Sequence, residues 1–222
     1  ADPLYVPHGI DTNAFCPGDT DYRDTIGADE SIFLVGINAM NRDETRKGWG
    51  EQFEAFARFH SCFPDTALTV NAADVNPKGL NLRKLALRLG ISDVVKFPDP
   101  FAYNMHMVSQ DNMISWYRGI DVLSLCSYGE GFGLPLVEAQ ACGTPVITTD
   151  GSAMTELCGA GWLVSATNYW ASRHNAWWRR PDVTDITQAY TDAYFAWKDG
   201  TLPGKEARDF ALQYDADKVA VQ

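Results

Sequence analysis

Residues 122–147 read VLSLCSYGEGFGLPLVEAQACGTPVI, two apolar runs separated by a glycine-rich loop and a helical pattern. The run Val122–Leu125 predicts a buried strand, and Pro135 suits the first turn of a helix, where its missing N–H costs nothing. We expect that helix to end near Cys142, directly before a second strand over residues 145–148. A strand, loop, helix and strand in this order indicate a unit of a parallel sheet.

The same alternation continues outward on both sides of this stretch. Short β-branched runs predict further strands at 31–37, 67–70, 93–97 and 162–164. Apolar residues at helical spacing predict helices over 53–63, 82–89, 111–119, 153–157, 183–197 and 205–214. Strands that alternate with helices in this way indicate the α/β class, with a single doubly wound, Rossmann-like parallel sheet.

Two stretches break this rhythm. Residues 101–110 lie between a strand and a helix, and we predict a loop there. Residues 168–181 are rich in tryptophan and arginine. This aromatic and basic segment could touch a membrane surface or another lobe, but the acidity of the chain favours a buried aromatic patch beside the terminal helices. The expected organisation is a linker over 1–17, a ligand-binding domain over 18–182 and packed C-terminal helices over 183–222.

The composition is that of a folded, acidic domain. The chain has 222 residues, 45% of them apolar, and a formal net charge of −11. This balance excludes a general affinity for nucleic acid or anionic lipid, which need a basic surface, but it allows a local phosphate pocket.

Cysteine usage and the chain start bear on location. Five cysteines without a CxxC spacing predict buried free thiols in a reducing compartment rather than a disulfide framework or a zinc site. No apolar stretch approaches the ~18 residues of a membrane span, and no signal peptide is present, so we predict a cytoplasmic location. The chain begins at Ala1 without an initiator methionine, which favours a fragment or a processed product.

The glycine-rich loop 127–135 is the first candidate ligand site. In an open parallel sheet, ligands bind beyond the carboxyl ends of the strands. The free N–H groups of Gly133 and Leu134 would lie at a helix N-terminus, which favours anions. Glu138, one turn further, could accept hydrogen bonds from a vicinal diol such as a ribose, and Glu130 could meet a second set of hydroxyls. The alternative is a plain strand-to-helix turn whose glycines serve only the bend.

The loop 41–48 is the second candidate, because it supplies positive charge. No Lys or Arg occurs between Gly119 and Ser172, so a phosphate at the glycine loop would need its cations from elsewhere. We expect Arg42, Arg46 and Lys47 to supply them. The alternative is a solvated loop whose cations pair with the neighbouring acids, Asp43 and Glu44.

These segments together resemble a known family. Residues 130–147 resemble the glutamate-pair signature of retaining family-4 (group 1) glycosyltransferases. Residues 6–17 resemble the segment through which those enzymes enter their C-terminal domain, and 46–48 resemble their diphosphate-binding loop. Residues 117–122 resemble the helix and strand that precede the signature. The resemblance implies one lobe, the donor-binding one, of the two-lobed GT-B arrangement.

The resemblance also implies roles for single residues. Glu138 would bind the ribose of a UDP or GDP sugar, and Glu130 would face the sugar near the reacting carbon. Lys47 would stabilise the leaving diphosphate, helped by Arg46 and by Arg42, which is one position off the expected spacing. The base would lie near Phe97. Backbone groups of the glycine loop would hold sugar and diphosphate, at Gly131, Phe132, Gly133 and Leu134.

The same resemblance bears on cofactors and partners. No metal or other cofactor is expected, because a lysine and a helix terminus take the metal's place. The acceptor is unknown, and an N-terminal acceptor-binding lobe is the expected partner, so this lobe alone would transfer sugar poorly or not at all. Two alternatives are a non-catalytic nucleotide or nucleotide-sugar module and another GT-B enzyme, such as a phosphorylase or an epimerase.

Overall fold

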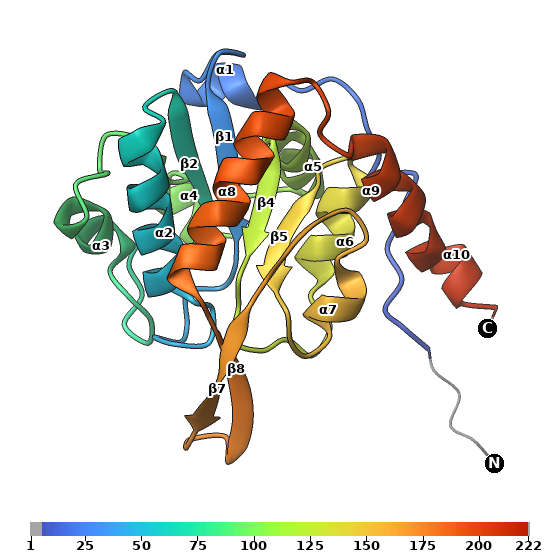
Figure 1. Cartoon of the computed structure of the whole chain (residues 1–222). Helices are drawn as coiled ribbons and strands as arrows, with labels where there is room; N and C mark the ends of the chain where they lie inside the picture. The colour runs from blue at the N-terminus through green and yellow to red at the C-terminus, as the bar shows by residue number, and fades with distance from the viewer. Residues whose placement is uncertain (1–5, 222) are drawn as a thin grey trace.

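A computed structural model describes residues 6–221 and has a six-stranded parallel sheet as its centre (Figure 1). The strand order is β3-β2-β1-β4-β5-β6, and every neighbouring pair is parallel. The predicted doubly wound α/β fold is therefore confirmed. The strands are β1 (Phe33–Asn38), β2 (Thr66–Asn71), β3 (Val95–Lys96), β4 (Val122–Leu125), β5 (Val146–Thr149) and β6 (Gly161–Val164).

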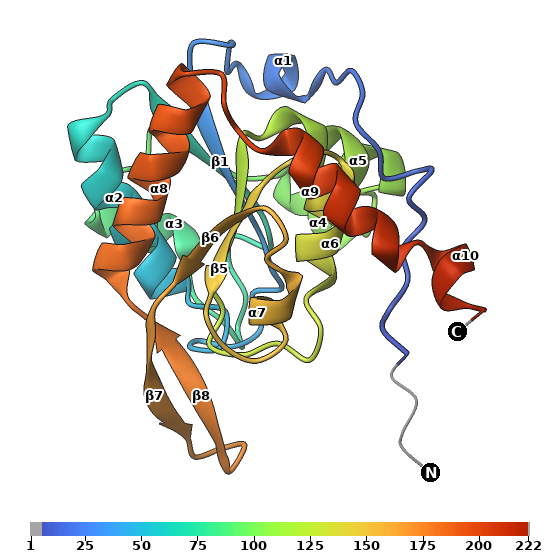
Figure 2. The ribbon, with the colours of Figure 1, turned by 45° about the vertical axis from the view of Figure 1, so that its right-hand side comes forward.

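Helices cover both faces of the sheet (Figure 2). One face carries α2 (Trp49–Cys62) and α8 (Val183–Lys198). The opposite face carries α5 (Gln110–Gly119), α6 (Leu134–Ala141) and α9 (Gly204–Ala211). The shorter helices are α1 (Tyr22–Ile26), α3 (Leu82–Arg88), α4 (Pro100–Asn104), α7 (Met154–Leu157), the 3₁₀ turn Leu212–Tyr214 and α10 (Ala216–Val219).

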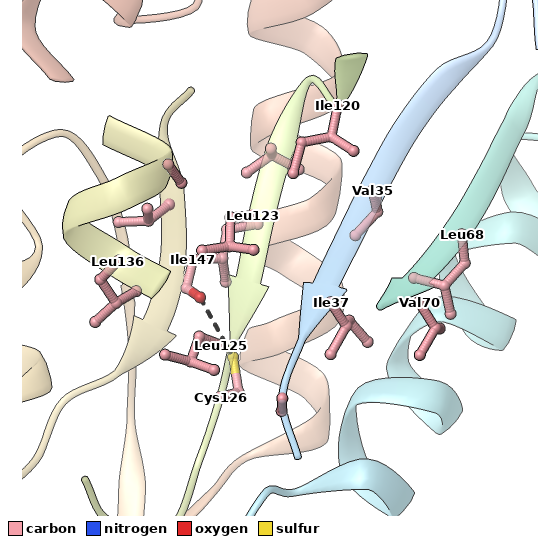
Figure 3. Close-up of a cluster of buried hydrophobic side chains, with 14 of the residues drawn as sticks. Val35, Ile37, Leu68, Val70, Ile120, Leu123, Leu125, Cys126, Leu136 and Ile147 are labelled. Atoms are coloured by element: carbon pink, nitrogen blue, oxygen red, sulfur yellow. Dashed lines mark hydrogen bonds between the residues drawn. The ribbon is translucent and has the colours of Figure 1, made fainter. Parts of the chain in front are cut away.

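The core follows from strands that are apolar on both faces. Phe33 to Ile37 of β1 and all of β4 are buried, as expected for the centre of a parallel sheet. Figure 3 shows side chains of β1, β2, β4 and β5 gathered with Leu136 of α6. On the other face, Phe59 and Tyr190 join α2 to α8, with ring centroids 5.7 Å apart. Both layers therefore hold the sheet rigid beneath the loops at its carboxyl edge.

The N-terminal segment lies against the C-terminal helices. The Ile10 N–H donates to the Tyr214 carbonyl, and the Ile10 carbonyl accepts from Ala216 N–H. Arg208 donates to the carbonyl oxygens of Thr12, Phe15 and Ala141. Residues far apart in the chain thus close one side of the fold.

Two sequence predictions about irregular segments are wrong. Residues 101–110 are not all loop, because α4 occupies Pro100–Asn104, capped by the Asp99 side chain. The aromatic and basic segment is not a buried patch: β7 (Ala166–Ala171) and β8 (Ala176–Pro181) form an antiparallel hairpin, in which Trp177 is 68% exposed. Its turn ends at Asn175, whose φ of 47° is one that asparagine tolerates. The two six-residue runs pair with each other and form a sheet separate from the central one.

The cysteines only partly match their prediction. All five are free thiols, and Cys126 and Cys142 are buried, which raises the pKa of each to about 12. Cys62 is exposed at the last turn of α2, so the prediction of burial is wrong there. It lies on the solvent side of an amphipathic helix, where packing places no demand on it.

Candidate functional site

The loops after β1 and β4 meet at the carboxyl edge of the sheet, because these strands are paired neighbours. The Glu130 carboxylate accepts hydrogen bonds from Lys47 Nζ at 2.5 Å, Arg46 Nη1 at 3.1 Å and Ser127 Oγ at 2.6 Å. The Lys47 and Glu130 side chains are only 11% and 9% exposed. Three of the predicted site residues are therefore in direct contact.

Backbone contacts fix this cluster. The Tyr128 N–H donates to the Arg46 carbonyl at 2.8 Å. Gly48 has a φ of 58°, and a Cβ there would lie 2.2 Å from the Cys126 carbonyl oxygen, so only glycine fits. Burial lowers the pKa of Lys47, while the nearby Glu130 charge opposes that shift and favours the ammonium form. The buried Lys47 ammonium is thus held in place by the Glu130 carboxylate.

The N-terminus of α6 lies in the same edge. Gly133 precedes the helix with a φ of 105°, no side chain caps the helix there, and a proline occupies its first turn. Such a terminus presents backbone N–H groups and a partial positive charge to an anion. Phe132 turns its ring toward His8 and Tyr214, with centroids 5.0 and 5.8 Å away. Its side chain therefore serves packing, which leaves the backbone of the loop for a ligand.

Glu138 is the end of a chain of polar side chains that crosses the sheet edge. Asn71 Nδ2 donates to Asn38 Oδ1 at 3.1 Å, and Asn38 Nδ2 donates to the Tyr117 hydroxyl at 2.7 Å. The Tyr117 O–H in turn donates to Glu138 Oε2 at 2.7 Å. Burial raises the pKa of Glu138, and the hydrogen bond from Tyr117 opposes that rise. One carboxylate oxygen is thereby oriented by a buried hydroxyl.

The sequence reading did not assign functional roles to Asn38, Asn71 and the Tyr117 hydroxyl. A usable signal was present for the two asparagines, since each ends an apolar strand at the carboxyl edge. Tyr117 shows no such signal, because it lies among buried apolar residues of α5. Its hydroxyl gains a role only through contacts with other elements.

Two adjoining pockets lie beside the row of polar side chains from Asn71 to Glu138. One of about 380 Å³ is lined by Phe97, Trp116 and Asn71, among others. The other, of about 340 Å³, is lined by Arg42, Tyr103 and again Asn71. Phe97 thus lines a pocket that reaches Asn71, at the far end of the polar side chains that lead to Glu138. Arg42 is exposed and lines the second pocket beside α4, whereas Arg46 and Lys47 bind Glu130.

Among residues 6–221, no three side chains of His, Cys, Asp or Glu are grouped so that they could hold a metal ion. Over the same residues, each helix is too short or too polar to cross a bilayer.

Comparison with known proteins agrees with this geometry. Residues 36–175 match the sequence family described as glycosyl transferases group 1. A D-inositol 3-phosphate glycosyltransferase 2 from Catenulispora acidiphila is 35% identical over 152 residues, which are 64% of this chain and 33% of that protein. The chain thus spans about a third of that relative's length.

Solved structures share the fold. The C-terminal domain of a glycosyl transferase group 1 family protein (LpcC) from Francisella tularensis superposes with a TM-score of 0.69 at 24% identity, covering 92% of this chain and 97% of that one. Anabaena HepE, solved in complex with UDP, superposes with a TM-score of 0.73 at 20% identity, covering 96% of this chain and 54% of that one. The chain therefore belongs to the group 1 glycosyltransferases, and its Rossmann-like sheet is that of the C-terminal lobe of a GT-B enzyme.

Proposed function

We propose that this lobe binds a nucleotide-diphosphate sugar and supplies the donor half of a retaining glycosyl transfer. The observation that carries the proposal is the convergence of Lys47, Arg46 and the uncapped α6 N-terminus at one edge of the sheet. Glu130 alone balances only one of the two cations in this cluster, and a diphosphate would supply the further negative charge. The related fold of HepE has been solved with UDP and with UDP-glucose, which supports a uridine nucleotide as the first candidate.

The rest of the donor would extend along the polar chain. Glu138 would accept hydrogen bonds from the two ribose hydroxyls, with Tyr117 holding its other side. The base would occupy the pocket at Phe97, about 380 Å³ in volume, and the pocket at Arg42 adjoins it. Gly131, Gly133 and Leu134 would approach the diphosphate and sugar through their backbone.

The chemical contribution of the lobe would be electrostatic. As the bond from the anomeric carbon to the diphosphate breaks, negative charge grows on the leaving oxygen. Lys47 and Arg46 would stabilise that charge without a metal ion. Glu130, released from these cations by the diphosphate, would accept hydrogen bonds from the donor sugar's hydroxyls.

The remaining features of the proposal concern the whole protein. An N-terminal lobe would carry most of the acceptor site and close over the donor, so this lobe alone would be poorly active. The curated relatives named for D-inositol 3-phosphate make a hydroxyl-rich acceptor the first candidate. The free thiols favour a reducing, cytoplasmic location.

Calorimetric titration with UDP, GDP and ADP tests the donor assignment. We expect one of them to bind, and Glu138→Ala to weaken its binding about tenfold or more, because a half-buried carboxylate that would accept two hydroxyls is lost. If none binds, or if Glu138→Ala leaves the affinity unchanged, the assignment is wrong. Slow release of UDP from UDP-glucose by the intact chain would favour an enzyme over a non-catalytic module.

A further inference from the structure

The hairpin β7–β8 projects past the carboxyl ends of the sheet strands, toward the side where the candidate site lies (Figures 1 and 2). A pocket of about 160 Å³ lies between this hairpin and the loop after β1. The loop lines it with Asp43, Glu44 and Thr45, and the hairpin lines it chiefly with Tyr169, His174 and Trp178.

Both walls of this pocket continue into the candidate donor site. Thr45 directly precedes Arg46, which binds Glu130. On the other wall, Trp178 lies against the residue before Glu130, since a Cβ on Gly129 would be 3.5 Å from its Cδ1. The pocket is therefore a neighbour of the Lys47–Glu130 cluster, and it shares with that cluster the loop after β1.

Backbone hydrogen bonds make this arrangement firm. The Arg179 N–H donates to the Tyr128 carbonyl at 2.8 Å, and Tyr128 N–H donates to the Arg46 carbonyl at the same distance. The Tyr128 hydroxyl also donates to Glu51, which binds Arg180 of β8. The hairpin is thus tied to both donor loops along one line of contacts.

The lining has the chemistry that recognises a hydroxyl-rich ring. Asp43 Oδ1 accepts the Thr45 and Arg46 N–H groups, which orients its carboxylate at the pocket. Two carboxylates can accept hydrogen bonds from neighbouring hydroxyls, and the Trp178 indole, which packs against the His174 ring with centroids 4.7 Å apart, adds an apolar wall for the C–H groups of a saturated ring. Because Asp43 and Glu44 outnumber the lining's one arginine, Arg173, a phosphate group is disfavoured.

The size of the pocket agrees with one small ring. A volume of about 160 Å³ holds about five water molecules at ~30 Å³ each. That is room for a single monosaccharide or cyclitol ring. The pockets at Phe97 and Arg42 are each more than twice as large.

We propose that this pocket is a subsite for the acceptor, and that it binds an uncharged, hydroxyl-rich ring beside the donor. The role as acceptor rests on the proposed donor function. In the transfer, an acceptor hydroxyl oxygen forms a bond to the anomeric carbon while the bond from that carbon to the diphosphate breaks. The bonding pair stays with the diphosphate, and the hydroxyl proton passes to the diphosphate oxygen or to water.

The test is titration of the ¹⁵N-labelled full chain with methyl α-D-glucopyranoside or with myo-inositol, followed at the Trp178 indole N–H signal. The first probe represents the end of a glycan and the second a free cyclitol. We expect one of them to bind with millimolar affinity, with UDP absent and with UDP present. Trp178→Ala should weaken binding about tenfold, and Glu44→Gln should weaken it several-fold.

Trp177 is the matched control. It is the adjacent tryptophan, 68% exposed, and it pairs with Trp170 on the opposite face of the hairpin, so Trp177→Ala should leave binding within about twofold. Glu44→Gln keeps the hairpin side chains, so it decides the matter if Trp178→Ala fails to fold. The proposal is overturned if neither probe moves the Trp178 signal, if UDP displaces the probe, or if Trp177→Ala costs as much as Trp178→Ala. Failure of UDP to bind would refute the donor function alone, because the probe titration is read without nucleotide.

Discussion

Replacement of Glu130 by glutamine tests how the cation cluster of this lobe works. The Glu130 carboxylate accepts hydrogen bonds from Lys47, Arg46 and Ser127, and its side chain is 9% exposed. A diphosphate that binds the same cations must displace this carboxylate and then lie next to its charge. Glu130→Gln removes the charge but keeps an oxygen that can accept from Lys47.

The two consequences have opposite signs. Stability should fall, because Lys47 is left buried beside a neutral group, by about 2 kcal/mol, less than the ~3–5 kcal/mol of losing a buried partner outright. Affinity for UDP should rise, because repulsion between the carboxylate and a diphosphate charge is removed. At a separation of about 8 Å and an effective dielectric of about 20, that repulsion is ~2 kcal/mol, or about 30-fold in affinity.

Calorimetry with UDP and with uridine, together with denaturant unfolding, measures both effects. Uridine lacks the diphosphate, so its affinity should stay within about twofold. Glu206→Gln, an exposed charge on α9, is the control for net charge and should change neither quantity. The reasoning is refuted if Glu130→Gln binds UDP more weakly than the parent chain, or if UDP and uridine affinities shift together.

Four further predictions concern the same edge. Lys47→Ala should weaken UDP binding by ~1.5–3 kcal/mol and should hardly change uridine binding. Arg42→Ala should lower the affinity for UDP only about twofold. Equal losses of UDP and uridine affinity in Lys47→Ala would contradict the role of Lys47. Tyr117→Phe should weaken UDP and uridine equally, by about 1 kcal/mol, in the same calorimetric titration, because only the orientation of Glu138 is lost; a loss confined to UDP would speak against this. UDP affinity should fall as the pH drops through the pKa of Glu138, which burial raises above 4.5, and Glu138→Gln should flatten the profile. Because the pKa of Glu138 is raised in the folded state, protonated Glu138 stabilises the fold. Its contribution to the free energy of unfolding is full below pH 4.5 and is lost as the pH rises through the folded-state pKa. Denaturant unfolding at several pH values measures this loss.

The predictable parts of the fold are those that depend on the local periodicity of apolar residues. The segment 122–147 forms β4, α6 and β5 within one or two residues of expectation, because apolar runs and Pro135 act locally. The strand expected over 93–97 is only Val95–Lys96, since pairing at a sheet edge depends on β2 and not on the run itself. The hairpin was missed because its pattern of alternating exposure is interrupted by arginine and tryptophan on both faces.

One part of the candidate site was likewise predictable from the sequence, and another part was not. Glu130, Lys47 and Arg46 could be grouped from their loops, because the carboxyl ends of adjacent strands share an edge. The row of hydrogen-bonded side chains from Asn71 to Glu138 could not be predicted from the sequence, because it depends on the register of β1 with β2 and on the turn of α5 that faces them. Registers of this kind are set by the whole core.

The distribution of charge supports the proposal that Lys47 and Arg46 bind the phosphates. The sequence has no cation between 119 and 172, yet the hairpin brings Arg179 and Arg180 close to the glycine loop. Both are already committed: Arg179 donates to Asn168 and packs over Gly151, and Arg180 pairs with Glu51. Lys47 and Arg46, by contrast, share a single carboxylate. Two cations facing one acid leave a net positive charge, and that imbalance favours an anionic ligand at this edge even in a chain of net charge −11.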